Sequence, residues 1–301
     1  MDIIEKKYWY FALSLLVVVP GLVFLLLSGL RLSIDFTGGS RITLSFPSKV
    51  DQQAKTRIKD LLGSQKISVG SLETSSNLMF IRTYPMDQNQ NNKFLAGLKS
   101  MKVSQKEFET VGPTIGRETT VSAVKAVLLA SFLIVLYIAW SFRSVPKPAS
   151  SFRFGVCAII ALIHDVLVVV GIFAILGYFF HVEVDSLFVT AVLTIIGFSV
   201  HDTIVVFDRI RENLRKTSGV SFSQVVNDSI LQTLGRSLNT SLTVILVLIS
   251  LLLFGGESIR WFVIALLVGI ISGTYSSIFN AAPILVVWHE LSIRRHSGKR
   301  A

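Results

Sequence analysis

The sequence predicts a helical membrane protein with six transmembrane spans and one small α+β domain outside the membrane. The 301 residues are 51% hydrophobic and only 16% charged, which is typical of a chain that lies mostly in lipid. Six apolar runs are long enough to cross a bilayer, and a segment of mixed polarity separates the first two. The sequence has one cysteine, Cys157, so the segment outside the membrane must fold without an internal disulfide.

The first apolar run follows Lys6 and Lys7 and at first resembles a signal peptide. It is too long for the apolar part of such a peptide, and no cleavage pattern of small residues follows it. We therefore expect an uncleaved first span. The six predicted spans are about 9–29, 121–141, 154–177, 187–207, 238–254 and 261–288.

Basic residues in the short loops predict the orientation of the spans. Loop 142–153 contains Arg143, Lys147 and Arg153, whereas loop 178–186 contains no Lys or Arg. Because short cytoplasmic loops carry the excess of Lys and Arg, both termini are predicted to be cytoplasmic. The same flanking residues account for the net charge of +10, so nucleic acid is not an expected partner. The predicted parts are 1–30, a first span with its N-terminus; 31–120, an exported domain; 121–291, a five-span domain; and 292–301, a basic cytoplasmic tail.

The exported segment has the pattern of a ferredoxin-like α+β unit. Apolar residues alternate over 34–36 and over 42–46, which predicts strands, and helical spacing follows over 54–62. Two further strands, a helix and a last strand fit 66–72, 78–84, 94–101 and 106–111. A strand, a helix, two strands, a helix and a strand make the ferredoxin-like order.

Glycine-rich motifs stand at both membrane ends of this domain. Gly38 and Gly39 lie between two predicted strands, where a tight turn needs a positive φ. Gly112, Pro113 and Gly116 lie just before the second span. Both motifs are either hinges between domain and membrane or rigid turns.

A carboxylate lies deep in the fourth span. Burying the Asp202 carboxylate in lipid costs roughly 2.5–3.5 kcal/mol, and chains usually retain such a group for a function. Arg236 opens the fifth span from the cytoplasmic side at a similar depth. An ion pair between the two would lower the cost of burying either charge. Asp202 and Arg236 are therefore the candidate proton relay; the alternative is that Asp202 is a structural carboxylate bonded to a neighbouring helix.

Three further ionisable residues lie within spans. His164 and Asp165 are near the middle of the third span, and His201 precedes Asp202. Each is either a second relay group or a helix-packing group bonded to polar neighbours. Gly269 and Gly273 have the spacing of a helix-packing seam. Because the sequence has no P-loop, no Cys/His metal spacing and no nucleophile with a base nearby, we expect neither an enzyme nor a bound cofactor.

Five motifs together resemble the SecD/SecF family of the bacterial Sec protein translocase. They are DFTGGS, GPTIGRE, ALIHDV, GFSVHDTIVVFDRIREN and TLGRSLNTS, and they extend over nearly the whole chain. The short chain and small exported domain resemble the smaller subunit of the SecD–SecF pair. The family's intramembrane Asp and Arg fall on Asp202 and Arg236, whereas some relatives have Asn where this chain has His201.

The resemblance implies half of a pseudo-symmetric twelve-span unit similar to the resistance–nodulation–division (RND) transporters. It implies use of the proton gradient, with protons as the only coupling species, to promote a late stage of protein export. The implied partners are a SecD-like subunit, the Sec channel, unfolded exported polypeptides and lipids of the bacterial inner membrane. Two alternatives remain open: half of an RND-like exporter of lipids or small molecules, and a passive assembly factor of the translocon.

Overall fold

The computed structural model describes residues 2–143, 145–146, 149–217 and 219–297. The chain forms two compact units. One is Leu32–Lys125, and the other combines the chain up to Arg31 with the chain from Ala126 onward. Lys147 and the last four residues of the predicted basic tail lie outside the described residues.

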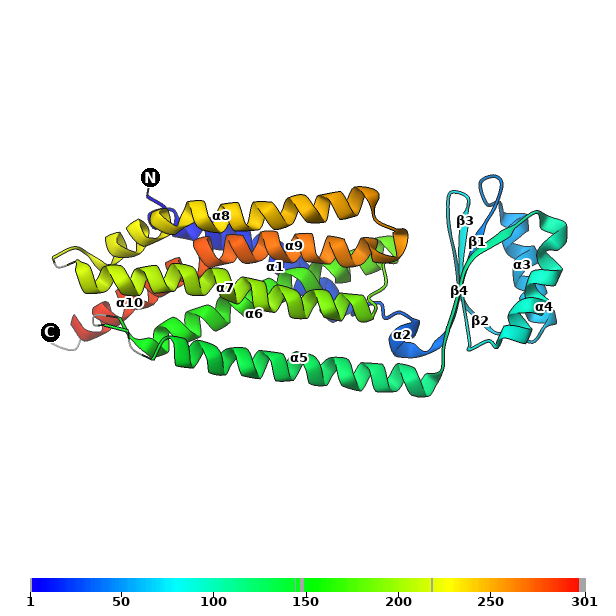
Figure 1. Ribbon diagram of the computed structural model, residues 1–301, viewed down its shortest axis with the longest axis horizontal. Helices are drawn as coiled ribbons and strands as arrows, with labels where there is room; N and C mark the ends of the chain where they lie inside the picture. Colours follow the sequence, from blue (N-terminus) through cyan, green and yellow to red (C-terminus); the bar gives the residue numbers. More distant parts are fainter. Residues whose placement is uncertain (1, 144, 147–148, 218, 298–301) are drawn as a thin grey trace. The chain divides into compact units, whose positions relative to one another are not determined.

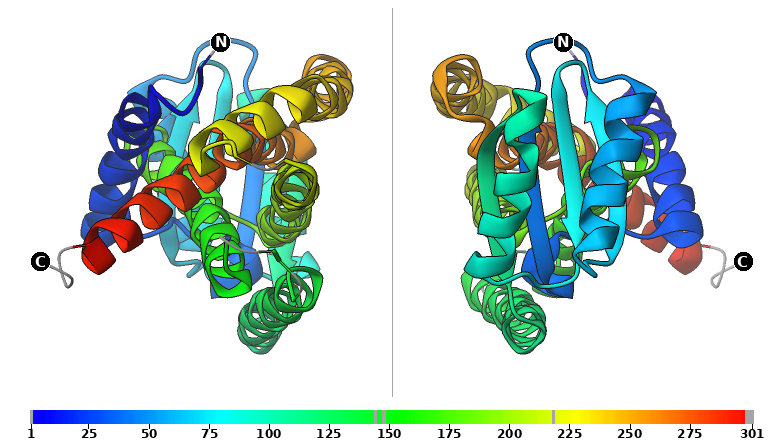
Figure 2. Two further views of the ribbon diagram at one scale, coloured as in Figure 1. Left: turned by 90° about the vertical axis from the view of Figure 1, so that its left-hand side faces the viewer. Right: turned by 90° about the vertical axis from the view of Figure 1, so that its right-hand side faces the viewer.

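The first unit has the predicted ferredoxin-like order. Its sheet is fully antiparallel with the strand order β2-β3-β1-β4. Helices α3 and α4 cover the same face of this sheet (Figure 2, right). The elements are β1 (Gly39–Ser45), α3 (Gln52–Ser64), β2 (Val69–Ser75), β3 (Leu78–Thr83), α4 (Gln88–Leu98), η1 (Lys99–Met101) and β4 (Ser104–Val111).

The core of this unit lies between the sheet and its two helices. Ile42 of β1, Ile58 of α3 and Phe94 of α4 are fully buried there, which confirms the apolar periodicity of the sequence. Asp51 and Asp87 start the two helices, because each side chain accepts a hydrogen bond from a backbone N–H of the first turn.

One strand prediction was wrong. The stretch around Ile34 is the short helix α2 (Ile34–Thr37), and the first strand begins only at Gly39. Ser33 caps this helix, since its side chain accepts a hydrogen bond from the N–H of Asp35 at 3.2 Å. Two alternating apolar residues are too few to distinguish a strand from one helical turn.

The second unit is a bundle of membrane-spanning helices (Figure 1). Within the described residues, six helices are long and apolar enough to cross a membrane, which confirms the six predicted spans. The sixth is composite and contains a π-helical turn. The elements are α1 (Lys7–Ser28), α5 (Pro113–Ser141), α6 (Ser151–Phe180), α7 (Ser186–Lys216), α8 (Phe222–Phe254), η2 (Glu257–Ile259), α9 (Arg260–Ser276), η3 (Ser277–Ala281) and α10 (Ala282–Ser297).

Several helices are longer than their apolar runs. Helix α5 starts at Pro113, where proline is tolerated because a first-turn N–H has no partner in the helix. Helix α7 continues to Lys216, and α8 begins at Phe222 after the cap Ser221. Hydropathy marks the stretch suited to lipid, whereas backbone hydrogen bonding continues beyond it.

Helices α6, α7 and α9 form the centre of the bundle, and glycines let them approach closely. A Cβ added to Gly269 would lie 2.2 Å from Ile195 Cδ1, and one added to Gly273 would lie 3.2 Å from Ser199 Cβ. This confirms the predicted packing seam and assigns it to α9 against α7. Large apolar side chains of α5, such as Leu128 and Phe132, are exposed along the edge of the bundle.

Candidate functional site

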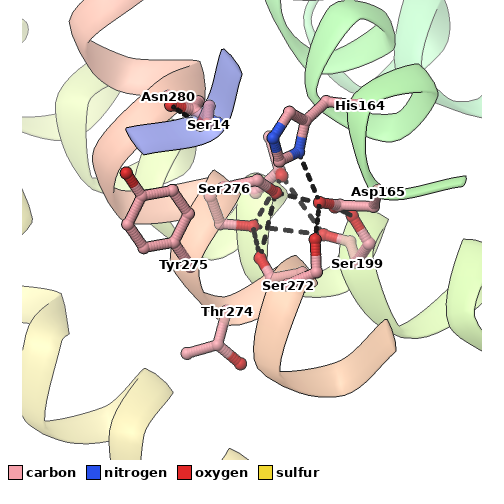
Figure 3. Close-up of polar contacts among 12 residues, drawn as sticks. Ser14, His164, Asp165, Ser199, Ser272, Thr274, Tyr275, Ser276 and Asn280 are labelled. Carbon is pink, nitrogen blue, oxygen red and sulfur yellow. Dashed lines mark hydrogen bonds and ion pairs between the residues drawn. The ribbon is translucent and has the colours of Figure 1, made fainter. Parts of the chain in front are cut away.

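Asp165 has a full set of hydrogen bonds within the membrane unit. It is fully buried on α6, and its carboxylate accepts four hydrogen bonds from three helices (Figure 3). The donors are Ser199 at 2.5 Å, Ser276 at 2.7 Å, Ser272 at 2.9 Å and His164 Nδ1 at 3.0 Å. Two donors reach each oxygen, so the carboxylate needs no further partner. This is the arrangement expected of a helix-packing group.

The His164 ring leaves one nitrogen without a partner. Its Nδ1 bonds to Asp165, while its Nε2 is buried and has no hydrogen-bond partner among the described residues. Close by, Ser14 of α1 and Asn280 of the π-helical turn bond to each other at 2.7 and 3.0 Å (Figure 3). A π-helical turn inside a long helix is often found at functional sites.

Asp202 is bonded far less completely. It lies on α7 with only 2% of its surface exposed, and Oδ2 of its carboxylate has no hydrogen-bond partner in the described chain. The hydroxyl groups of Ser237 on α8 and Thr274 on α9 lie beside it. The Ser237 hydroxyl is also buried without a partner, while Thr274 bonds to Ser241 at 2.5 Å. A buried carboxylate with an empty acceptor position is costly to keep ionised.

Arg236 does not complete this site. Its side chain is exposed, and no ion pair between Arg236 and Asp202 forms among the described residues. The predicted Asp202–Arg236 pair is therefore absent from this structure. His201, also exposed, turns away from the core while Asp202 turns toward it.

Arg236 begins a polar stripe along the outside of α8. The stripe consists of Arg236, Asn239, Thr240 and Thr243, which are all exposed and whose spacing places them on one helix face. The Thr240 and Thr243 hydroxyls bond to carbonyls of their own helix at 2.9 and 2.8 Å. Such a face is unfavourable against lipid, because polar groups in hydrocarbon are costly.

The glycine motifs of the α+β unit pack against each other. Gly38 and Gly39 have φ values of 70° and 122°, which confirms the predicted positive-φ turn. A Cβ on Gly38 would lie 3.0 Å from the Pro113 Cα, and one on Gly116 would lie 2.8 Å from the Gly38 nitrogen. Thr120 donates a hydrogen bond to the Phe36 carbonyl at 3.3 Å. The backbones of the two motifs therefore meet directly.

Three serines that bond to Asp165 were not predicted from the sequence. Ser199, Ser272 and Ser276 supply three of the four donors to Asp165. The spacing of Ser272 and Ser276 was the available signal, since residues four apart share a helix face. In the part of the chain that the structure describes, no three His, Cys, Asp or Glu side chains come together as metal ligands.

Comparison with known proteins places this architecture in a family. A six-span bundle with buried acids and a ferredoxin-like insert defines a polytopic membrane protein of the RND-like class. Residues 90–291 match the family described as "Protein export membrane protein SecD/SecF, C-terminal", and residues 23–46 match the "SecD/SecF GG Motif". The chain belongs to the SecD/SecF family, and within it to the SecF subunits of the protein translocase.

Three relatives illustrate the match. "Protein translocase subunit SecF" of Thermobaculum terrenum is 49% identical, with 98% of this chain and 96% of the relative covered. "Protein translocase subunit SecDF" of Bacillus subtilis is 35% identical over 99% of this chain, which spans only 39% of that relative. The crystal structure of SecDF from Thermus thermophilus aligns with a TM-score of 0.82 and 33% identity, covering 96% of this chain and 39% of that one.

Proposed function

We propose that this SecF subunit uses the proton-motive force, together with a SecD-like partner, to promote a late stage of preprotein translocation. The observation that supports this proposal is the Asp202 carboxylate, which is almost fully buried in a span with Oδ2 unpartnered. A proton arriving at Oδ2 would neutralise this buried charge. Since the transmembrane potential contributes roughly 2.3 kcal/mol per charge per 100 mV, one such event can shift a two-state helix bundle appreciably.

Two observations support the SecD-like partner. The polar stripe of α8 and the exposed His201 of α7 are unfavourable against lipid, so both favour a protein partner at these positions. The Bacillus subtilis relative is named SecDF, and this chain aligns with 39% of it. The remaining part of that relative therefore corresponds to the partner proposed for this chain. In that complex, Arg236 would point toward the partner while its charge acts on Asp202. Purification in mild detergent should therefore recover a larger multi-span protein, and an active monomer would contradict the proposal.

The other expected properties belong to the same proposal. Both termini would face the cytoplasm of a bacterial cell, and the α+β unit would be exported, where it would meet unfolded polypeptide leaving the Sec channel. The Gly38-Gly39 and Gly112-Pro113 motifs would transmit movement between the unit and the membrane. Protons would be the coupling species without a bound cofactor, and the chain would catalyse no covalent reaction.

The central test substitutes the carboxylate. An Asp202→Asn variant keeps the shape of the side chain but cannot change charge, so it should assemble normally and lose gradient-dependent stimulation of export in inverted vesicles. Asp208→Asn is the matched control, because Asp208 lies on the same helix, is half-exposed and pairs with Arg211. It should export normally. Full gradient-driven export by Asp202→Asn would refute the proposal and favour a passive assembly role.

Arg236→Ala provides a second measurement. If the charge of Arg236 helps Asp202 to ionise during the cycle, this variant should reduce gradient-dependent export while the complex still assembles. Lys at the same position should restore part of the activity, because it retains the charge. Equal export by Arg236→Ala and the unmodified chain would show that Arg236 has no role in the mechanism. It would not contradict the role of Asp202.

A further inference from the structure

Helix α9 lies between the two buried acids of the membrane unit. Ser272 and Ser276 donate hydrogen bonds to Asp165 at 2.9 and 2.7 Å from one helix face. Thr274 is two residues from each of them, and at about 100° per residue it lies on the opposite face. On that face, the Thr274 hydroxyl lies 2.5 Å from the Ser241 hydroxyl of α8 and near the Asp202 carboxylate. The rotation of α9 about its axis therefore determines which α9 side chain contacts the Asp202 carboxylate.

The Asp165 carboxylate is the point at which this rotation is fixed. It belongs to α6, and it receives Ser199 from α7 and two serines from α9. Serine side chains are short and have one rotatable bond before the hydroxyl, so they tie the carboxylate closely to the helix backbone. The contact is tight, because a Cβ on Gly273 would lie 3.2 Å from Ser199 Cβ and 3.6 Å from Asp165 Oδ2.

Ser276 has another acceptor when the carboxylate is removed. The Ser276 hydroxyl already lies 3.2 Å from the Gly273 carbonyl of its own helix. A serine that bonds to its own helix satisfies its hydroxyl but no longer ties α9 to α6. Removing the carboxylate should therefore release the Ser276 bond between α9 and α6 without leaving this hydroxyl unpaired.

We propose that Asp165 is a positioning residue for the Asp202 site: by holding Ser272 and Ser276, it fixes the rotation of α9 that presents Thr274 to Asp202. In this role, Asp165 holds the serines and does not itself carry the proton. The proposal deepens the proposed function, since it rests on Asp202 as the responsive group. Its first test does not depend on export.

The first test measures the rotation of α9 by cross-linking. The Ser241 and Thr274 hydroxyl oxygens are 2.5 Å apart, so cysteines at both positions should form a disulfide under mild oxidation in membranes containing the full chain. The background is Cys157→Ser. Asp165→Ala should lower the disulfide yield about threefold or more, because both serine ties are lost. Asp165→Asn retains one carbonyl oxygen for two donors and should lower the yield less than about twofold.

A second variant covers the case in which Asp165→Ala does not fold. The double variant Ser272→Ala and Ser276→Ala keeps the carboxylate with Ser199 and His164 but removes both ties to α9. It should reduce cross-linking as Asp165→Ala does, whereas Ser250→Ala on the exposed face of α8 should not. An unchanged yield in the double serine variant would overturn the proposal.

The second test separates positioning from proton transfer. Asp165→Asn should retain most of the gradient-dependent export, since its amide oxygen keeps one of the two α9 serines bonded but cannot accept a proton. If Asp165→Asn abolishes that export with cross-linking intact, Asp165 carries the proton and the positioning role is wrong. If Asp202→Asn exports normally, the proposed function fails instead, and the cross-linking result still reports on α9.

Discussion

The seam between α7 and α9 allows a quantitative test of how this bundle packs. The perturbation is Gly269→Ala. The added Cβ would lie 2.2 Å from Cδ1 and 2.3 Å from Cγ1 of Ile195, far inside the 3.5–4.0 Å at which carbon atoms make favourable contact. Ile195 is 1% exposed, so its side chain cannot make room by turning out toward the surface.

The expected cost follows from packing. Overpacking a filled core costs about 1–3 kcal/mol, and in a unit of this size each kcal/mol lowers the melting temperature by roughly 2–4 °C. Ile195→Ala alone leaves a cavity and should cost about 2–5 kcal/mol. In the double variant, the new methyl group enters the space that Ile195 vacated. The double variant should therefore cost less than the sum of the two single variants, by about 1 kcal/mol or more.

Thermal unfolding of the purified chain in detergent measures all three variants. Gly197→Ala is the matched control, since a Cβ at this α7 position meets no atom within 4 Å. It should be neutral or should stabilise the helix by up to about 1 kcal/mol. Additive costs for the two seam variants, or a Gly269→Ala effect no larger than that of Gly197→Ala, would refute the close approach of α9 to α7.

Three further predictions concern other parts of the chain. Single cysteines at Ser64 and Val220, in a cysteine-free background, should react with an impermeant thiol reagent from opposite sides of the membrane, and labelling from one side contradicts the topology. Gly39→Ala should destabilise the α+β unit by about 1–3 kcal/mol in thermal unfolding, because φ is 122° and the Cβ would lie 2.7 Å from a carbonyl oxygen; an unchanged midpoint contradicts this. Lys7→Gln should lower the free energy of unfolding by at most about 1 kcal/mol, since the side chain of Glu290, its ion-pair partner at 2.8 Å, is 39% exposed. If the costs of Lys7→Gln and Glu290→Gln add fully in the double variant, the ion pair contributes nothing to stability.

The sequence predicted the architecture well because hydropathy and periodicity report directly on burial. The six apolar runs of the sequence correspond to the six candidate spans of the described structure. The order of strands and helices in the α+β unit was predicted from the spacing of apolar residues such as Ile42 and Phe94. The exception was α2, where the Ser33 cap outweighs an alternation only two residues long. Local capping there decides the conformation.

The candidate site was only partly predictable. Hydropathy gives the depth of a residue in the membrane but not the direction in which its helix turns. Asp202 and Arg236 were placed at similar depth, yet one is buried and the other exposed. The four donors to Asp165 come from residues up to 111 positions away in the sequence, and only the packing of α9 against α6 and α7 brings them together. Serine is common in packed membrane helices, so the four-residue spacing of Ser272 and Ser276 was a weak signal, and Ser199 had none.

The meeting of the two glycine motifs has a mechanical consequence for the α+β unit. Strands β1 and β4 are neighbours in the sheet, and Gly39 lies opposite Val111 where the chain enters and leaves it. Because the backbones of Gly38 and Pro113 also touch, tension applied through either end of the unit reaches the same few atoms. Pulling the ends apart would therefore act first on this contact and on the nearest hydrogen bonds between β1 and β4, and only later on the rest of the sheet.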